Sequence, residues 1–278
     1  MPRLRLSPRF VGFLVVTLSL APARLASQTS LSPEEKEHFL RHAKIVDSEP
    51  IGKGTTDPWR LTLSDGTLRH DAAFQYVDQR KPTAEFARRR PENNFRDSYT
   101  FNVAAWELAK LLGLEHMVPV TVERAWRGKR GALSWWVRAE WDEGERLAQA
   151  LEPPDRQDWN RQMYTVRAFT GLIYDTDRNH GNMLITKDWQ LWMIDFTRGF
   201  RRWPQLQTKA GLTKCELGLF ERLKGLRAVE LHEKLYRYLS KSEIEALVAR
   251  RDLLIKHYLS IAAEMGDDWV FFHDPTPR

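Results

Sequence analysis

The segment from Leu172 to Phe200, LIYDTDRNHGNMLITKDWQLWMIDFTRGF, places aspartates and asparagines between runs of large apolar residues. Burying polar side chains in an apolar environment is costly unless they have hydrogen-bond or charge partners. These aspartates and asparagines therefore need partners. NMLIT and WQLWMIDF read as two short strands joined by a turn at Lys187-Asp188. Such a hairpin brings the outer ends of its strands together. We therefore expect Asp177, Asn182 and Asp195 to converge on one point.

The chemistry of these three side chains indicates a metal site. Carboxylate and amide oxygens suit Mg²⁺, which is often held by one or two carboxylates together with substrate phosphates. A further carboxylate close by can orient or deprotonate a hydroxyl nucleophile. The segment predicts a site for magnesium or manganese with an acid–base residue beside it.

The N-terminal half of the chain is rich in strand signals. A helix is expected to start after Ser32, whose capping box is completed by Glu35. A β-hairpin with its turn at Asp65-Gly66 follows a Gly-x-Gly loop, Gly52 to Gly54. Residues 79–97 are polar and contain two prolines, so we expect a long exposed loop there.

The pattern then changes to one helix, two strands and a helical half. The helix runs from Asp97 to Gly113, and two strands follow with a turn at Arg127–Gly131. Three helical patterns at 214–226, 228–239 and 241–265 close the protein, the last one capped at Ser240. The fold class is α+β with two lobes: a β-rich lobe over residues 32–141 with one main helix, and a helical lobe over 142–266. The hinge is expected at Trp141–Gly144.

The spacing of the polar residues resembles a known family. Asp177, then Asn182 five residues later, then Asp195 after an apolar run, is similar to the catalytic and metal-binding loops of the protein-kinase-like fold. Arg178 follows the first aspartate, as in the atypical phosphatidylinositol 3-/4-kinase-like and secretory-pathway kinase-like branches. The resemblance covers roughly residues 45–265. It implies that Asp177 is the catalytic base and that Asn182 and Asp195 bind metal.

The β-rich lobe departs from that family at two positions. The third strand carries Gln75 where a phosphate-contacting lysine is expected, and the following helix carries Asn102 where the partner glutamate is expected. A neutral Gln–Asn pair leaves no unpaired buried charge. Either Lys53, in the Gly52–Gly54 loop that would cover the phosphates, supplies the cation, as in the with-no-lysine kinases, or nucleotide binds weakly or not at all.

The resemblance implies a phosphotransferase that binds Mg–ATP between the lobes and phosphorylates a hydroxyl of a protein, lipid or small molecule. The acceptor is unknown. Two alternatives stay open: transfer of AMP with the same metal site, and a pseudokinase that acts as a nucleotide-binding or protein-binding regulator.

The N-terminus indicates export. Three arginines precede the apolar run Phe10–Ala21, and Ala21-Pro22-Ala23 matches a cleavage site, so residues 1–23, possibly to about 28, read as a signal peptide. The run is short for a membrane span, and we expect none in the mature chain, although an uncleaved anchor is an alternative. The expected location is exported or secreted, periplasmic if bacterial.

Charge and cysteine usage limit the partners. The net charge of +6 falls to +3 without the three leader arginines, and no nucleic-acid partner is expected from it. Cys215 is the single cysteine and is expected to be a small buried residue. The tail over residues 267–278 either docks a partner through DDWVFFHD or packs back on the helical lobe.

Overall fold

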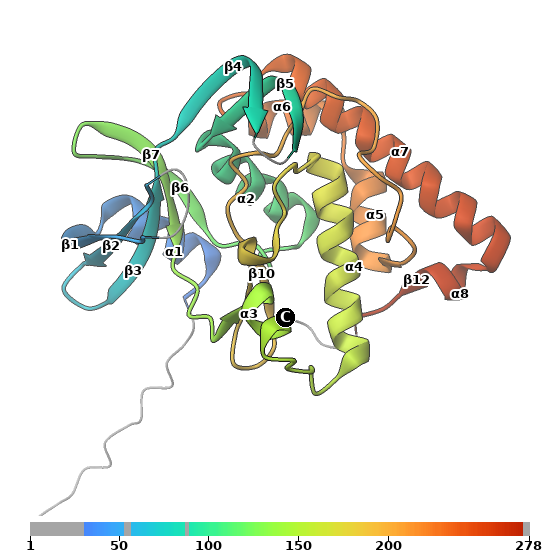
Figure 1. Ribbon diagram of the computed structural model, residues 1–278, viewed down its shortest axis with the longest axis horizontal. Helices are drawn as coiled ribbons and strands as arrows, with labels where there is room; N and C mark the ends of the chain where they lie inside the picture. Colours follow the sequence, from blue (N-terminus) through green and yellow to red (C-terminus); the bar gives the residue numbers. More distant parts are fainter. Residues whose placement is uncertain (1–30, 53–56, 87–88, 275–278) are drawn as a thin grey trace, which may run out of the picture. The chain divides into compact units, whose positions relative to one another are not determined.

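The computed structural model describes residues 31–52, 57–86 and 89–274 (Figure 1). The expected leader, together with Lys53 and Gly54, lies outside the described residues. Within those ranges, no helix is long and apolar enough to cross a membrane.

The N-terminal lobe is built on a five-stranded antiparallel sheet with the order β1-β2-β3-β7-β6. The strands are β1 (Lys44–Pro50), β2 (Trp59–Ser64), β3 (Arg69–Gln75), β6 (Thr121–Trp126) and β7 (Lys129–Trp135). Both hairpins expected from the sequence, β2–β3 and β6–β7, are confirmed. Strand β1 was not expected, because it is an edge strand with a mostly exposed surface and little apolar alternation.

Two helices cover this sheet and fill its core. Helix α1 (Pro33–His42) begins at the predicted capping box of Ser32 and Glu35. Helix α2 (Thr100–Leu112) ends at Gly113, whose φ of +67° favours glycine. Its apolar face and the inward residues of the strands belong to one buried cluster that includes Phe74, Trp106 and Leu133. This packing fixes the first turn of α2 against the end of β3.

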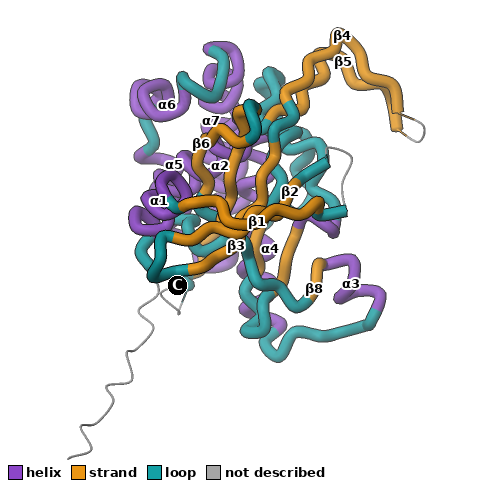
Figure 2. The backbone as a smooth tube through the Cα atoms, turned by 90° about the vertical axis from the view of Figure 1, so that its left-hand side faces the viewer, coloured by secondary structure: helices purple, strands orange, loops and turns teal. Residues whose placement is uncertain are grey.

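Residues 79–86 and 89–97 form a two-stranded ribbon, and the expectation of an exposed loop was wrong. Strands β4 (Asp78–Phe86) and β5 (Arg89–Ser98) pair antiparallel and extend away from the five-stranded sheet (Figure 2). A two-stranded ribbon offers one hydrogen-bonding edge per strand, so it tolerates Pro82 and Pro91 better than the interior of a sheet would.

The C-terminal lobe carries a second, three-stranded sheet with the order β10-β9-β8. Its strands are β8 (Trp141–Asp142), β9 (Met183–Ile185) and β10 (Leu191–Met193), flanked by α3 (Glu143–Ala148) and α4 (Arg156–Ile173). The expected hinge at Trp141–Gly144 is therefore a strand and the start of a helix. Asp142 pairs in the sheet and caps α3, and the irregular connection between the sheets is residues 136–140.

The C-terminal helices are α5 (Leu217–Gly225), α6 (Ala228–Leu235) and α7 (Lys241–Met265), and α7 opens with the expected capping box at Ser240. Helix α8 (Asp267–Val270) leads into β12 (Phe271–Phe272), which pairs in parallel with β11 (Cys215–Glu216). The Phe271 ring lies 4.5 Å from that of Phe220. The alternative that the tail packs back on this lobe is confirmed for the described part of the tail. Cys215 is buried as expected, and burial raises the pKa of its thiol.

Candidate active site

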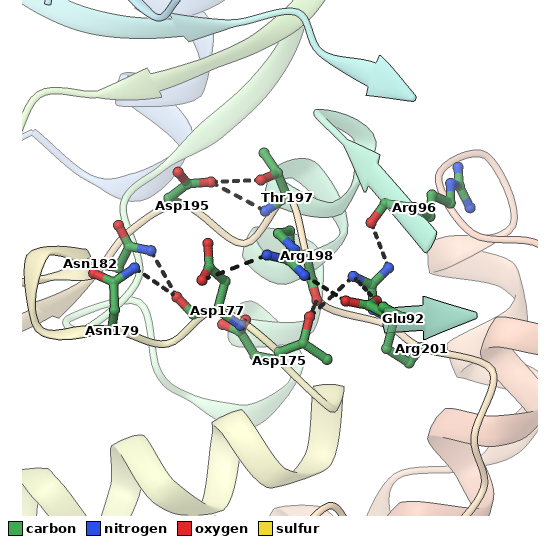
Figure 3. Close-up of polar contacts among 11 residues, drawn as sticks. Glu92, Arg96, Asp175, Asp177, Asn179, Asn182, Asp195, Thr197, Arg198 and Arg201 are labelled. Atoms are coloured by element: carbon green, nitrogen blue, oxygen red, sulfur yellow. Dashed lines mark hydrogen bonds and ion pairs between the residues drawn. The ribbon is translucent and has the colours of Figure 1, made fainter. Parts of the chain in front are cut away.

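The β9–β10 hairpin brings the two polar loops together. Met183 and Met193 are paired across it, and the Ile194 amide donates to the Asn182 carbonyl at 3.1 Å. Asn182 therefore enters β9 at the end of the hairpin where Asp195 leaves β10, as the sequence predicted. Figure 3 shows Asp177, Asn182 and Asp195 in the same region.

The loop from Asp177 to Asn182 is closed by its own side chains. The amide nitrogen of Asn182 donates to the Asp177 carbonyl at 3.0 Å, and Asn179 caps the short 3₁₀ turn η1 (His180–Asn182) by accepting from Gly181 at 2.9 Å. Because the nitrogen of the Asn182 amide is engaged, its oxygen is the atom left to face a cation. These contacts fix the Asn182 side chain relative to the backbone at Asp177.

Arg178 joins this loop to the strand that leads to Asp195. Its guanidinium donates to the carbonyls of Asn182 at 2.7 Å and Ile194 at 2.5 Å, and pairs with Asp175 at 2.6 Å. The guanidinium also stacks over the Phe196 ring at 4.6 Å. Asp175 in turn accepts from the Asp177 amide at 2.9 Å. In the sequence, Arg178 was notable only because it directly follows Asp177. Its contacts show that it holds the two loops together.

Asp195 has an unusual backbone conformation, with φ of +53°. Such a conformation is strained for a residue other than glycine and is maintained only by surrounding contacts. The hydroxyl of Thr197 donates to Asp195 Oδ1 at 2.9 Å, so the threonine supports this turn. The buried Asp97 lies near this turn, and its pKa is raised, chiefly by burial and also by the charge of Asp195.

Gln75 and Asn102 contact each other directly. Gln75 ends β3, and Asn102 lies in the first turn of α2. The Asn102 amide nitrogen donates to the Gln75 amide oxygen at 2.7 Å, and the Asn102 oxygen accepts from the Phe196 amide, also at 2.7 Å. Glu107 is directed elsewhere and pairs with Lys110. The neutral pair therefore links the N-terminal lobe to the residue after Asp195.

A chain of charged side chains that sequence reasoning missed adjoins Asp177. Arg198 lies 3.8 Å from an Asp177 carboxylate oxygen and pairs with Glu92 at 2.5 Å, and Glu92 pairs with Arg201 at 2.6 Å (Figure 3). Glu92 comes from β5, far from Asp177 in sequence. No local pattern pointed to it, because its role depends on where the ribbon lies in the fold.

The glycine loop was expected before the β2–β3 hairpin, and in the structure Gly52 lies directly before β2 in the chain, after the unexpected strand β1. Gly52 has φ of +68°, and the Ile51 amide donates to the Pro58 carbonyl at 2.9 Å to close the base of the loop. Lys53 and Gly54 fall outside the described residues, so the alternative that Lys53 supplies the phosphate cation stays a prediction.

Asn182 and Asp195 offer oxygen atoms of the type that a hard divalent cation prefers. One carboxylate and one amide oxygen form a small set, of the kind that Mg²⁺ completes with water and substrate phosphates. Within residues 31–52, 57–86 and 89–274, no group of three or more His, Cys, Asp or Glu side chains is arranged to hold a metal ion.

Comparison with known proteins gives the fold. No protein-family model and no curated protein sequence matches the chain. Among solved structures it is similar to hydra Fam20, determined with a sugar, with a TM-score of 0.61 and 16% identity over 87% of this chain and 93% of that one. It is also similar to the Helicobacter pylori proinflammatory kinase CtkA, with a TM-score of 0.51 and 12% identity over 81% and 96% of the two chains. The fold is thus that of the atypical kinase-like proteins, as the loop spacing predicted.

Proposed function

We propose that the chain is a phosphotransferase that binds a nucleotide with Mg²⁺ or Mn²⁺ between its lobes and transfers a phosphoryl group to a hydroxyl. The observation that carries the proposal is the clamp by Arg178, which holds the Asp177–Asn182 loop and the Asp195 strand end in one arrangement. The solved structures that share the fold support the same class of activity.

The roles follow from the chemistry of each side chain. Asp177, whose side chain keeps 30% of its surface exposed, would accept a hydrogen bond from the acceptor hydroxyl and align it with the phosphoryl group. Asn182 and Asp195 would hold the divalent ion, which neutralises charge on the nucleotide phosphates when bound. Arg198 orients the Asp177 carboxylate, and the Gly52 loop would cover the phosphates.

The neutral pair of Gln75 and Asn102 favours a second candidate, a pseudokinase that binds a nucleotide or a protein partner without catalysis. Neither side chain offers a charge to the α- and β-phosphates, so the cation would have to come from elsewhere, for example from Lys53. Export, inferred from the leader, would place either activity outside the cytosol.

Metal-dependent nucleotide binding tests the proposal. We expect ATP with Mg²⁺ or Mn²⁺ to raise the melting temperature of the wild type and not that of Asp195→Ala, since specific binding stabilises the folded state by mass action. No metal-dependent shift in the wild type would remove nucleotide binding from the proposal. Binding without turnover over a panel of hydroxyl acceptors would favour the pseudokinase.

Two further variants assign roles within a binding-competent protein. Phosphoryl transfer that is unchanged in Asp177→Ala would exclude Asp177 as the acceptor-orienting residue. Unaltered nucleotide affinity in Lys53→Ala would mean that the phosphate cation comes from another residue. Mass analysis of the product separates the addition of a phosphoryl group from the addition of AMP.

A further inference from the structure

A pocket of about 260 Å³ lies beside the candidate active site, between the β4–β5 ribbon and the helical lobe. Its charged lining comes from four elements. Arg80 and Lys81 belong to β4, Arg96 to β5, Arg201 and Arg202 to the segment after Asp195, and Glu243 to the first turn of α7. Five cations and one carboxylate line it, and we call it the basic pocket.

Two of the five cations form ion pairs with carboxylates, and Arg201 shares its carboxylate with Arg198. Arg96 forms a two-pronged pair with Glu243, at 2.6 and 2.7 Å, and Arg201 pairs with Glu92 at 2.6 Å. Arg80, Lys81 and Arg202 are exposed to solvent around them. A concave site with a surplus of one charge sign concentrates ions of the opposite sign. The pocket therefore attracts anions.

The two buried arginines also have unused donors. Arg96 and Arg201 keep only 8% and 3% of their surface exposed, and the Nε atom of each has no hydrogen-bond partner among the described residues. Buried donors of this kind are normally satisfied by water or by an ion. Both nitrogens are themselves buried, so the cations that can reach a ligand from the rim of the pocket are the exposed Arg80, Lys81 and Arg202.

We propose that the basic pocket binds an oxyanion of the phosphate class. A phosphate presents oxygens in several directions, which matches cations arriving from β4 and the segment after Asp195. A carboxylate has two coplanar oxygens and fits a single arginine better. The site is separate from Asp177, Asn182 and Asp195, and it does not depend on the proposed phosphotransferase activity.

The experiment measures binding of inorganic phosphate in EDTA, by calorimetry and by melting temperature, at constant ionic strength. EDTA removes divalent metal, so no metal–nucleotide complex can form at the candidate active site. The result is therefore separable from the test of the proposed function. We expect phosphate to stabilise the wild type more than acetate does. Each of Arg80→Gln and Arg202→Gln should weaken binding about threefold, as for one exposed charge pair, and the double variant about tenfold.

Arg69→Gln is the matched control, because Arg69 is an exposed arginine on β3 that does not line the pocket. It should bind phosphate like the wild type, and all variants should melt like the wild type without phosphate. The proposal is overturned if phosphate adds nothing beyond equal ionic strength, if acetate is as effective, or if the double variant binds as the wild type does. O-phosphoserine identifies the source: tighter binding than inorganic phosphate indicates an attached phosphate, and weaker binding indicates the free ion.

Discussion

Asn102 and Gln75 are joined by a 2.7 Å hydrogen bond that takes the place of the ion pair expected between these two elements. The same Asn102 side chain accepts from the Phe196 amide next to Asp195. One neutral side chain therefore fixes the end of β3, the start of α2 and the turn that carries Asp195.

The first prediction concerns this bridge. Asn102→Ala removes both hydrogen bonds and leaves the buried Phe196 amide unpaired, so we expect a loss of about 2–4 kcal/mol in the free energy of unfolding. Gln75→Ala, which leaves the bond to Phe196 intact, should cost about 1 kcal/mol. Urea denaturation of both single variants and the double variant measures their coupling. Strictly additive losses would show that the two amides do not act as a pair.

A second prediction concerns the Arg178 clamp. Arg178→Lys cannot make the same set of bonds to Asn182, Ile194 and Asp175, and it leaves a buried carboxylate poorly paired. We expect a loss of about 3 kcal/mol in the free energy of unfolding. Asp175→Asn should show a comparable loss.

The control for the clamp is Arg156→Lys. Arg156 pairs with Glu152 at 3.3 Å, and both side chains are well exposed. Breaking or loosening such a pair costs less than about 1 kcal/mol. If Arg178→Lys were as mild as this control, the clamp would not hold the two loops.

Local sequence signals predicted the elements that carry the site. The caps at Ser32 and Ser240, the stop at Gly113 and the strand pattern around Asn182 and Asp195 each depend on a few neighbouring residues. The predicted hairpin placed the two loops together and the kinase-like spacing indicated the fold, and the structure agrees on both.

Contacts that depend on tertiary structure were not predictable in this way. The β4–β5 ribbon has a polar sequence with prolines, so its residues resemble a loop until they pair with each other. The partnership of Glu92 with Arg198 depends on that ribbon, and it was missed with it. Strand β1 was missed because an exposed edge strand needs no apolar alternation.

A third prediction concerns pH and His70. The ring stacks on Trp135 with centroids 3.7 Å apart, and burial lowers the pKa of His70 below its usual value. The unfolded chain therefore binds the proton more readily than the folded one. The contribution of neutral His70 to the free energy of unfolding is fully present above the pKa of histidine in the unfolded chain, about 6.5. It is lost as the pH falls below that value towards the lower pKa of His70 in the folded protein.

The test compares the wild type with His70→Phe, which keeps a stacked ring that cannot titrate. Chemical denaturation from about pH 7.5 to about pH 5.5 should show the wild type losing more stability than the variant. Parallel profiles would mean that His70 contributes nothing to the pH dependence.

A fourth prediction concerns the tail. Val270 is fully buried, and β12 lies against Cys215 in β11. Val270→Ala should cost about 1–2 kcal/mol in the free energy of unfolding, while Val229→Ala, at a valine on α6 that is 56% exposed, should cost less. Ending the chain at Gly266 should uncover Cys215, which we expect to react with a maleimide far faster than in the full chain. Equal rates would show that the tail does not shield the thiol.

The last prediction concerns Glu92, which holds two buried arginines beside Asp177. Glu92→Gln leaves Arg198 and Arg201 without this carboxylate, and an uncompensated buried charge is costly, so we expect a loss of about 3 kcal/mol. Glu49→Gln, at an exposed carboxylate that pairs with Arg60 at 3.3 Å, should cost less than about 1 kcal/mol. Because part of the Glu92→Gln loss is the stranded charge of Arg198, adding Arg198→Gln should cost less than the sum of the two single changes. Additive losses in chemical denaturation would mean that the two side chains stabilise the fold independently. Glu92 on the ribbon would then not be coupled to Arg198 beside Asp177.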